Sequence, residues 1–322
     1  MIALVVFGTL VVSLILTIPV GFSLAVASLA SILYTKQLTF GFIAQNMVTA
    51  ADSFPIMAIP FFVFAGELMG GGGISKRLLD VANVFFGKIS GGLAIVTVVV
   101  CMFFAAISAS GPATVAAVGG MVVPTMLQKG YDRKFVLALI AAAGSIGVII
   151  PPSIPMVVYS VTTNSSVSKL FMAGFIPGIV IGLGLIAYCY LFAKKNGYKG
   201  DETKYTGKEI AHIVWDAKWA LIAPVIILGG IYGGIFTPTE AAAVSVIYSM
   251  IVGIFIYKEI DLKGLLDITK NACETTAAIL IVIGCAAAFS KVLTLGRIPI
   301  AVANGLTALT SNKFLILLLI NV

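Results

Sequence analysis

Two short stretches of small and hydroxyl-bearing residues interrupt long apolar runs in the first half of the sequence. The first, SASGPAT at residues 108–114, separates the apolar residues 93–104 from the apolar residues 115–126. The second, GSIGVIIPPSIP at residues 144–155, lies within the apolar run 135–161. Serine and threonine hydroxyls, together with carbonyls freed at a helix break, are oxygen ligands for a hard cation. Because neither stretch contains a carboxylate, the residue types favour sodium.

The composition indicates the elements that must position these residues. Of the 322 residues, 60% are hydrophobic and only 10% are charged, and the mean hydropathy is +1.12. This is too little polar surface for a soluble globule of this size, so a multi-spanning helical membrane protein is expected. The apolar runs are residues 2–34, 54–69, 93–127, 135–161, 170–193, 219–236, 241–257, 277–289 and 314 onward.

Several classes of function are disfavoured by the polar residues. The net charge is +7, but the basic residues lie in short clusters between apolar runs, which is typical of cytoplasmic loops and not of nucleic-acid binding. His212 is the single histidine, which argues against a histidine-based enzyme and a multi-histidine metal site. We therefore expect neither an enzyme nor a bound cofactor. The four cysteines, which have no metal-like or redox spacing, are expected to be buried apolar residues: Cys101, Cys189, Cys273 and Cys285.

The basic clusters also predict an orientation in the membrane. The lysine-rich residues 194–218 are expected in the cytoplasm, and residues 74–90 carry a second basic cluster on the same side. If residues 135–161 and 170–193 each cross once, residues 91–128 must cross an even number of times. As one helix these 38 residues would be about 57 Å long, nearly twice the thickness of the hydrocarbon core.

Two arrangements of residues 91–128 satisfy this count. Two full spans would place the SASGPAT stretch in water outside, whereas a re-entrant hairpin would place it near mid-membrane, lining a cavity. The flanking legs of about 15 residues are short for full spans and favour the hairpin. Pro151 and Pro152 predict a break in the next span. A proline kink with packing glycines is the plainer alternative, but two breaks at similar depth favour a site for a cation and an anionic substrate.

An internal repeat supports this interpretation. PVGFSLAVA at residues 19–27 is similar to PTEAAAVSV at residues 238–246, and KQLTF at residues 36–40 parallels KEIDL at residues 258–262. The period is about 220 residues, and the predicted orientations of the two copies are opposite. Inverted repeats with broken helices are typical of secondary transporters.

The period also predicts how the chain is divided. Added to the first hairpin tip, it would place a second tip beyond the last residue, so the C-terminal part of the second repeat is expected to be missing and this fragment is not expected to transport by itself. The predicted parts are a first inverted repeat at residues 1–193, with the hairpin at 91–128 and the broken helix at 135–161, a cytoplasmic linker at 194–218, and an incomplete second repeat at 219–322.

Four motifs carry a resemblance that extends over essentially the whole chain. They are SASGPATVAAVG at residues 108–119, GSIGVIIPPSIP at residues 144–155, FFVFAGELM at residues 61–69 and FTPTEAAA at residues 236–243. The chain resembles the large membrane subunit (M subunit, DctM-like) of tripartite ATP-independent periplasmic (TRAP) transporters. The resemblance implies an elevator-type fold similar to the ion transporter superfamily, located in a bacterial or archaeal cytoplasmic (inner) membrane and surrounded by lipid.

The resemblance also implies a function, partners and site residues. The function would be sodium-coupled import of an organic acid, such as a dicarboxylate or a sialic acid. A periplasmic binding protein would deliver the carboxylate substrate, and a small four-helix membrane subunit would brace the large one. Sodium, the coupling ion, would be bound at Ser108, Ser110, Gly111, Thr114, Gly144, Ser145, Gly147, Ile150 and Pro151. Substrate contacts would come from Ser110, Pro112, Pro152 and Ser153.

A stand-alone sodium/anion symporter of a related superfamily is the main rival, and it differs in needing no binding protein. An ion channel is disfavoured because no ring of charges or symmetric filter is evident. Among other polar residues, Glu67 is expected at the membrane interface or paired with Lys76 or Arg77. Glu240 is expected to stabilise a helix N-terminus, and Arg297 to lie outside the hairpin.

Overall fold

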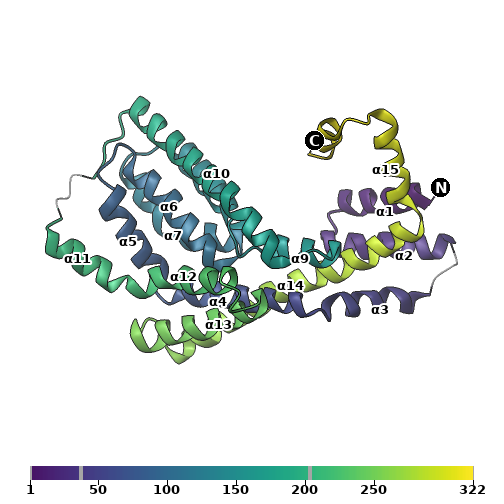
Figure 1. The fold of residues 1–322 in the computed structure, drawn as a ribbon, viewed down its shortest axis with the longest axis horizontal. Helices are drawn as coiled ribbons and strands as arrows, with labels where there is room; N and C mark the ends of the chain where they lie inside the picture. Colours follow the sequence, from purple (N-terminus) through teal and green to yellow (C-terminus); the bar gives the residue numbers. More distant parts are fainter. Residues whose placement is uncertain (1, 36–38, 202–204, 322) are drawn as a thin grey trace. The chain divides into compact units, whose positions relative to one another are not determined.

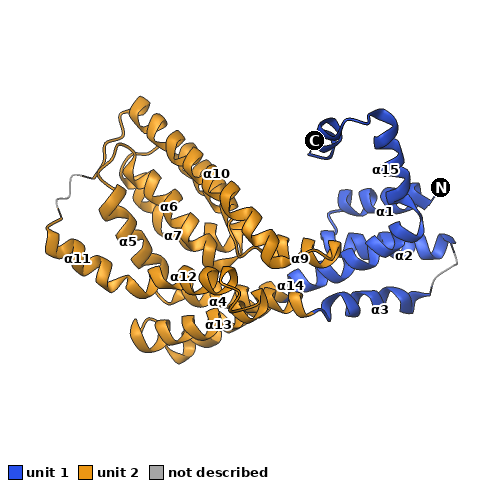
Figure 2. Cartoon of the chain, in the orientation of Figure 1, with its two compact units in different colours: residues 1–53, 277–322 blue, residues 54–276 orange. Residues whose placement is uncertain are grey.

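The chain folds into helices joined by short connections (Figure 1). The computed structural model describes residues 2–35, 39–201 and 205–321, and no strand occurs among them. The expected all-α class is therefore confirmed. Contacts between residues divide the chain into two compact units (Figure 2), one made of residues 1–53 with 277–322 and the other of residues 54–276.

The first unit is built from both ends of the chain. Its core contains Ile32, Ile43 and Ala288. Helix α2 approaches α14 closely at Gly21, where an added Cβ atom would lie 3.1 Å from Val282 Cγ2. The helices of this unit are α1 (Ile2–Ile15), α2 (Val20–Thr35), α3 (Phe40–Ala51), the second part of α14 (Leu262–Leu295), α15 (Ile298–Leu309) and α16 (Lys313–Asn321).

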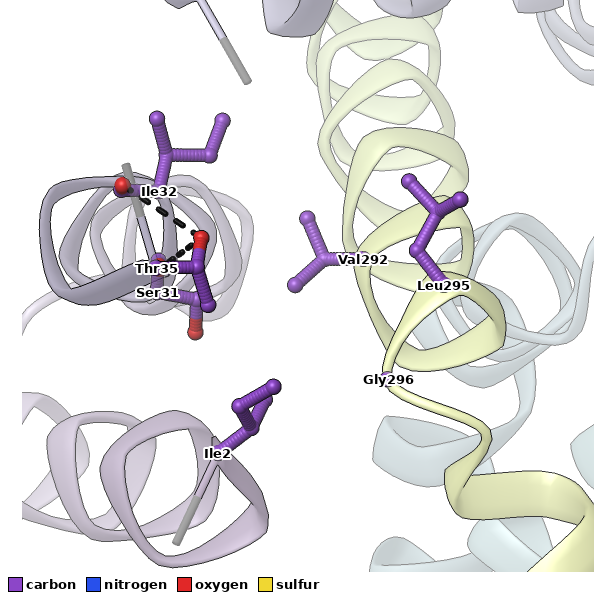
Figure 3. A pocket seen from close by; sticks show the side chains of 7 residues that line it. All are labelled: Ile2, Ser31, Ile32, Thr35, Val292, Leu295 and Gly296. Carbon is purple, nitrogen blue, oxygen red and sulfur yellow. Dashed lines mark hydrogen bonds between the residues drawn. The ribbon is translucent and has the colours of Figure 1, made fainter. Parts of the chain in front are cut away.

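A cavity of about 280 Å³ lies in this unit between α1, α2 and the end of α14 (Figure 3). Its lining residues, all within the described part of the chain, include no charged side chain. The hydroxyl of Thr35 donates to the Ser31 carbonyl of its own helix at 2.9 Å. The polar groups of the cavity are thus engaged within α2, and none of the predicted site residues lies in its lining.

The second unit is arranged around α6, which packs against α4, α5, α7, α8, α10 and α12. Because α6 is apolar all round, it is buried along almost its whole length. The unit comprises η1 (Phe54–Met57), α4 (Ala58–Gly71), α5 (Ile74–Phe86), α6 (Gly92–Ser108), α7 (Gly111–Gln128), α8 (Arg133–Ser145), η2 (Ile146–Val148), α9 (Ile154–Thr163), α10 (Val167–Asn196), α11 (Gly207–Asp216), α12 (Lys218–Tyr232), α13 (Pro238–Met250), the π-helical η3 (Ile251–Ile256) and the first part of α14.

Several helices have the length and composition of membrane spans. Within the described part of the chain, four meet both criteria by themselves, namely Phe54–Gly71, Val167–Asn196, Pro238–Ile256 and Leu262–Leu295. Helices α11 and α12, bent by 49° at their junction, would make a fifth. Shorter apolar helices include α1, α2, α6, α9 and α15. These helices agree with a polytopic membrane protein.

Helix α14 is longer than the apolar run that predicts it. The sequence predicts a span at residues 277–289 after a separate amphipathic stretch, whereas α14 is a continuous helix of 34 residues from Leu262 to Leu295. The sequence of α14 contains no proline, so nothing forces a break between the two parts. At its start the Asp261 carboxylate accepts a 2.7 Å hydrogen bond from the Gly264 backbone N–H, as an N-capping side chain does.

The division into repeats stays a prediction. The two compact units follow contacts in space and do not coincide with the predicted repeats. Residues 36–38 of the KQLTF copy and residues 202–204 of the predicted linker lie outside the described residues. The rest of the linker contains the end of α10 and the whole of α11, which begins with a capping box between Thr206 and Glu209.

Candidate functional site

Helices α6 and α7 form a hairpin with a two-residue turn inside the SASGPAT stretch. Helix α6 ends at Ser108, and Ala109 takes the left-handed conformation, with φ 55°. Ser110 is extended, and its hydroxyl accepts a 3.4 Å hydrogen bond from the Ala113 backbone N–H at the start of α7. Pro112 lies in the first turn of α7, where a backbone N–H has no partner within the helix.

Three oxygen atoms come together at this turn, and we call them the oxygen cluster: Ser108 Oγ, Thr114 Oγ1 and the Ser110 carbonyl oxygen. The two hydroxyls lie 3.2 Å apart. Thr114 Oγ1 donates to the Ser110 carbonyl at 2.8 Å, and Ser108 Oγ donates to the same carbonyl at 3.3 Å. Both side chains are fully buried. The cluster is thus a compact set of uncharged oxygen atoms shielded from solvent.

The break between α8 and α9 packs directly behind the oxygen cluster. A Cβ atom added at Gly147 in η2 would lie 2.9 Å from Thr114 Oγ1 and 3.2 Å from the Ser110 carbonyl oxygen. One added at Gly111 would lie 3.2 Å from the Gly144 carbonyl oxygen. The glycines therefore allow the backbones of the hairpin and the break to approach each other closely.

Hydrogen bonds also hold the break in place. The Ser153 hydroxyl donates to the Val148 carbonyl at 2.6 Å, bridging the segment that contains the two prolines. The Ile154 backbone N–H, at the start of α9, donates to the Ala109 carbonyl in the hairpin turn at 3.4 Å. The turn of the hairpin and the beginning of α9 are therefore linked directly.

The structure brings together only part of the predicted residue set. Around the oxygen cluster lie Ser108, Ser110, Gly111, Thr114, Gly144 and Gly147. Ser145 is exposed, and its hydroxyl donates to the Ala142 carbonyl of its own helix at 2.7 Å. The Ile150 side chain packs against Gly178 of α10.

The remaining predicted contacts have mixed exposure. Pro151, Pro152 and Ser153 are buried, whereas Pro112 is exposed. The assignment of each of these residues to sodium or substrate stays a prediction.

A glycine of α4 contributes to the site without having been predicted. A Cβ atom added at Gly66 would lie 3.0 Å from both Cα and Cβ of Ser108. Gly66 thus allows α4 to pack against the end of α6, beside the oxygen cluster. A glycine inside an otherwise helical apolar stretch is the signal that could have indicated this close approach.

The ends of four helices meet at the site. Helix α6 ends at Ser108 and α8 ends at Ser145, whereas α7 begins at Gly111 and α9 at Ile154. Carbonyl ends of helices favour a cation, and amide ends favour an anion. Within the described residues no group of three or more histidine, cysteine or acidic side chains could hold a metal ion. The site thus presents uncharged oxygen atoms at the carbonyl ends of two helices, beside the amide ends of two others.

The other polar residues singled out in the sequence lie elsewhere. Glu240 forms a capping box with Thr237 at the start of α13, which confirms the expected stabilisation of a helix N-terminus. Arg297 is exposed between α14 and α15. Arg77 pairs with Asp216 at 2.9 Å and with Glu259 at 3.4 Å. The suggested pairing of Arg77 with Glu67 is wrong, because Arg77 extends toward α11 and the segment before α14.

Comparison with known proteins identifies the family. The model of the family described as "Tripartite ATP-independent periplasmic transporter, DctM component" matches residues 7–322. The chain belongs to the DctM family. It is 47% identical over 318 residues to the isethionate TRAP transporter permease protein DctMQ of Oleidesulfovibrio alaskensis, covering 99% of this chain and 50% of that protein.

Two other large permease proteins are similar in sequence to this chain. The C4-dicarboxylate TRAP transporter large permease protein DctM of Pseudomonas aeruginosa is 40% identical over 280 residues, covering 87% of this chain and 65% of the relative. The sialic acid TRAP transporter large permease protein SiaM of Vibrio cholerae is 36% identical over 303 residues, covering 94% of this chain and 71% of the relative. This DctM-family chain therefore spans half of the first relative and 65% of the second.

Proposed function

We propose that this DctM-family chain belongs to a permease that imports an organic anion by sodium-coupled secondary transport. The observation that carries the proposal is the buried oxygen cluster, where Ser108, Thr114 and the Ser110 carbonyl converge against the break after α8. Uncharged hydroxyl and carbonyl oxygens at helix ends are the ligands that secondary transporters use for sodium. Family membership supports the same function.

The geometry suggests how sodium and substrate are coupled. The hydroxyls of Ser108 and Thr114 both lie within hydrogen-bond distance of the Ser110 carbonyl and 3.2 Å from each other. On cation binding, these oxygens turn their lone pairs toward the ion, which fixes the turn between α6 and α7. The first turn of α7 then presents its amide end to the anion at a defined position. Sodium binding thereby prepares the substrate site, and the loaded hairpin moves with its supporting helices in an elevator-type step.

The relatives suggest the class of substrate and the partners. Their names include isethionate, a C4-dicarboxylate and sialic acid, so we propose an organic anion with a carboxylate or sulfonate group. We also propose that a periplasmic binding protein delivers it and that a small four-helix membrane subunit supports the permease. The name of the relative DctMQ combines M, for the large subunit, with Q, for the small subunit. A permease in which both are one protein agrees with such a pairing. The assembly would lie in the cytoplasmic (inner) membrane.

Uptake into proteoliposomes tests the proposal. The permease is reconstituted with its small membrane subunit, and uptake of labelled isethionate, succinate and sialic acid is measured with and without an inward sodium gradient. Each measurement is repeated with and without a cognate periplasmic binding protein. We expect uptake of one of these anions only when both the sodium gradient and the binding protein are present.

The other outcomes separate the alternatives. Sodium-dependent uptake without the binding protein would replace the tripartite function by a stand-alone symporter. Uptake driven equally well by a potassium gradient would remove the sodium role of the oxygen cluster. Replacing sodium by potassium at constant ionic strength is the matched control for both conclusions.

A further inference from the structure

A groove outside the proposed transport site runs between α8 and α10. It has a volume of about 390 Å³ and is lined by Asp132, Lys134, Phe135, Ala138, Leu139, Ala142, Leu185, Tyr188 and Phe192. One end is polar and the remainder is apolar. The small side chains of Ala138 and Ala142 leave room along α8, opposite Leu185 and Tyr188 of α10. The groove therefore has the shape and polarity of a site for an amphipathic molecule.

Aromatic contacts fix the polar end of this groove. The Phe135 and Phe192 rings stack with their centroids 4.1 Å apart, and the Tyr131 and Tyr198 rings stack at 4.3 Å. The Tyr198 hydroxyl also accepts a 3.0 Å hydrogen bond from the Asp132 backbone N–H. These contacts hold the start of α8 beside the end of α10, so the groove is formed by a preorganised pair of helix ends.

Two lysines lie on the helix ends that form this part of the groove. Lys134 lines the groove, and Lys195 follows Leu185, Tyr188 and Phe192 on the same face of α10 by helical spacing. Within the described residues, neither lysine has an ion pair. The one acidic residue in the lining, Asp132, accepts a 2.9 Å hydrogen bond from the Phe135 backbone N–H and caps α8.

We propose that this groove binds an anionic phospholipid of the cytoplasmic leaflet. The phosphate would lie between Lys134 and Lys195, and one acyl chain would lie along Ala138 and Ala142. Lys195 belongs to the basic cluster at residues 194–218 that predicts the cytoplasmic side, and the Asp132–Tyr198 hydrogen bond holds Lys134 at the same end. Anionic lipids of that leaflet attract lysine and arginine side chains. The charge at one end and the apolar walls beyond it match the two parts of such a lipid.

The site would act on the transport machinery through α8. The same helix carries Lys134 at its first turn and Gly144, beside the oxygen cluster, at its last turn. A lipid between α8 and α10 would therefore stabilise the position of the first half of the broken helix. This inference concerns lipid binding and does not depend on the identity of the transported anion.

Native mass spectrometry of the purified permease with its small subunit tests the proposal. Phosphatidylglycerol or phosphatidylcholine with identical acyl chains is added, and the bound fraction is measured. We expect preferential retention of phosphatidylglycerol. Because a lysine near the surface contributes about 1 kcal/mol to binding of anionic lipid, Lys134→Gln and Lys195→Gln should each weaken retention about fivefold.

Two matched controls separate this site from general effects. Lys169→Gln removes an exposed lysine at the opposite end of α10 and should leave retention unchanged. Ala138→Leu places a larger side chain where the acyl chain would lie and should reduce retention of phosphatidylglycerol. Ala141→Leu changes an exposed position of α8 outside the lining and should not. Equal retention of the two lipids, or equal effects of a site variant and its control, would overturn the proposal. So would occupation of the groove by the small subunit, detected as cross-linking to Ala138→Cys.

Discussion

Ser108 Oγ and Thr114 Oγ1 lie 3.2 Å apart across the turn between α6 and α7. The two side chains come from different helices, yet both reach the Ser110 carbonyl oxygen. Both are buried, so their oxygens do not contact bulk solvent in this arrangement. A cation bound between these oxygens would join the end of one helix to the start of the next, which connects ion binding to the shape of the hairpin.

Removing one of these hydroxyls should weaken the response to sodium. A hydrogen-bonding group that faces a charge contributes roughly 1.5–3 kcal/mol, so Thr114→Ala should raise the sodium concentration for half-maximal uptake about ten- to hundredfold. Ser108→Ala should act in the same direction, and Thr114→Ser, which keeps the hydroxyl, should have a much smaller effect. The measurement is initial uptake in proteoliposomes as a function of sodium concentration.

Thr125→Ala is the control for this prediction. Thr125 lies on the same helix, α7, but is exposed, and its hydroxyl donates to the Met121 carbonyl at 3.2 Å. Its removal should leave the sodium dependence unchanged. If Thr125→Ala and Thr114→Ala shifted the curve equally, the effect would belong to α7 as a whole and not to the oxygen cluster.

Adding a methyl group behind the cluster should have a related effect without removing any oxygen. At Gly147 an added Cβ atom would lie 2.9 Å from Thr114 Oγ1, so Gly147→Ala should displace the hydroxyl and weaken sodium dependence by about tenfold. At Gly120 of α7 no atom lies within 4 Å of such a Cβ atom. Gly120→Ala should therefore preserve sodium dependence, and a normal sodium curve for Gly147→Ala would contradict the proposed position of the ion.

Part of this site can be predicted from the sequence. The breaks near Ser110 and Pro151 follow from local chemistry, because hydroxyl, glycine and proline residues interrupt two apolar runs. The approach of Gly147 to Thr114 does not follow from local chemistry, since the two residues are in different helices. Only the packing of η2 against the hairpin brings them together.

The same distinction explains the errors in the rest of the fold. Hydropathy predicts too short a helix for α14, because polar residues before residue 277 lower hydropathy without interrupting a helix. The partners of Arg77 were also missed. Asp216 is 139 residues away and Glu259 is 182 residues away in the sequence, whereas Glu67 is a close neighbour in the chain. Sequence proximity is a poor guide to ion pairs when three separate segments meet.

The Arg77 contacts should stabilise the junction of these segments. Arg77 binds Asp216 and Glu259 and lies over the Tyr257 ring, with its guanidinium carbon 3.7 Å from the ring centroid. Because the acidic partners are about half exposed, we expect Arg77→Gln to lower the free energy of unfolding by only about 1 kcal/mol. Arg77→Lys should recover part of this loss. Thermal unfolding in detergent measures the change.

High salt provides a second test of the Arg77 contacts. Raising the ionic strength screens half-exposed ion pairs. The difference in the free energy of unfolding between the wild type and Arg77→Gln should therefore become smaller at 1 M salt, where the Debye length is about 3 Å. Arg133→Gln is the control, because Arg133 is exposed at the start of α8 and forms no ion pair in the described part of the chain. An equal loss of unfolding free energy for Arg133→Gln would show that the Arg77 ion pairs do not stabilise the junction.

Helix α11 should respond to acid through its capping box. The Thr206 backbone N–H, followed by its hydroxyl, holds the pKa of the Glu209 carboxyl below its usual range. A pKa that is lower in the folded state contributes stability above the unfolded value, about 4.3 for glutamate, and this stability is lost as the pH falls through the folded value. We therefore expect the start of α11 to loosen below about pH 4.3. The two tryptophans of the chain, Trp215 and Trp219, lie at the α11–α12 junction, so their fluorescence reports the change.

Glu209→Gln separates this carboxyl from other acids. Glutamine retains an oxygen that can accept the hydrogen bond from the Thr206 backbone N–H but does not ionise, so the fluorescence change between about pH 3 and pH 5 should become smaller. Asp261→Asn alters the acidic residue that accepts a hydrogen bond at the start of α14 and should leave the tryptophan signal as it is in the wild type. Both substitutions replace a carboxylate at a helix start by an amide, but at different helices. If Asp261→Asn removed the transition and Glu209→Gln did not, the acid response would originate outside α11.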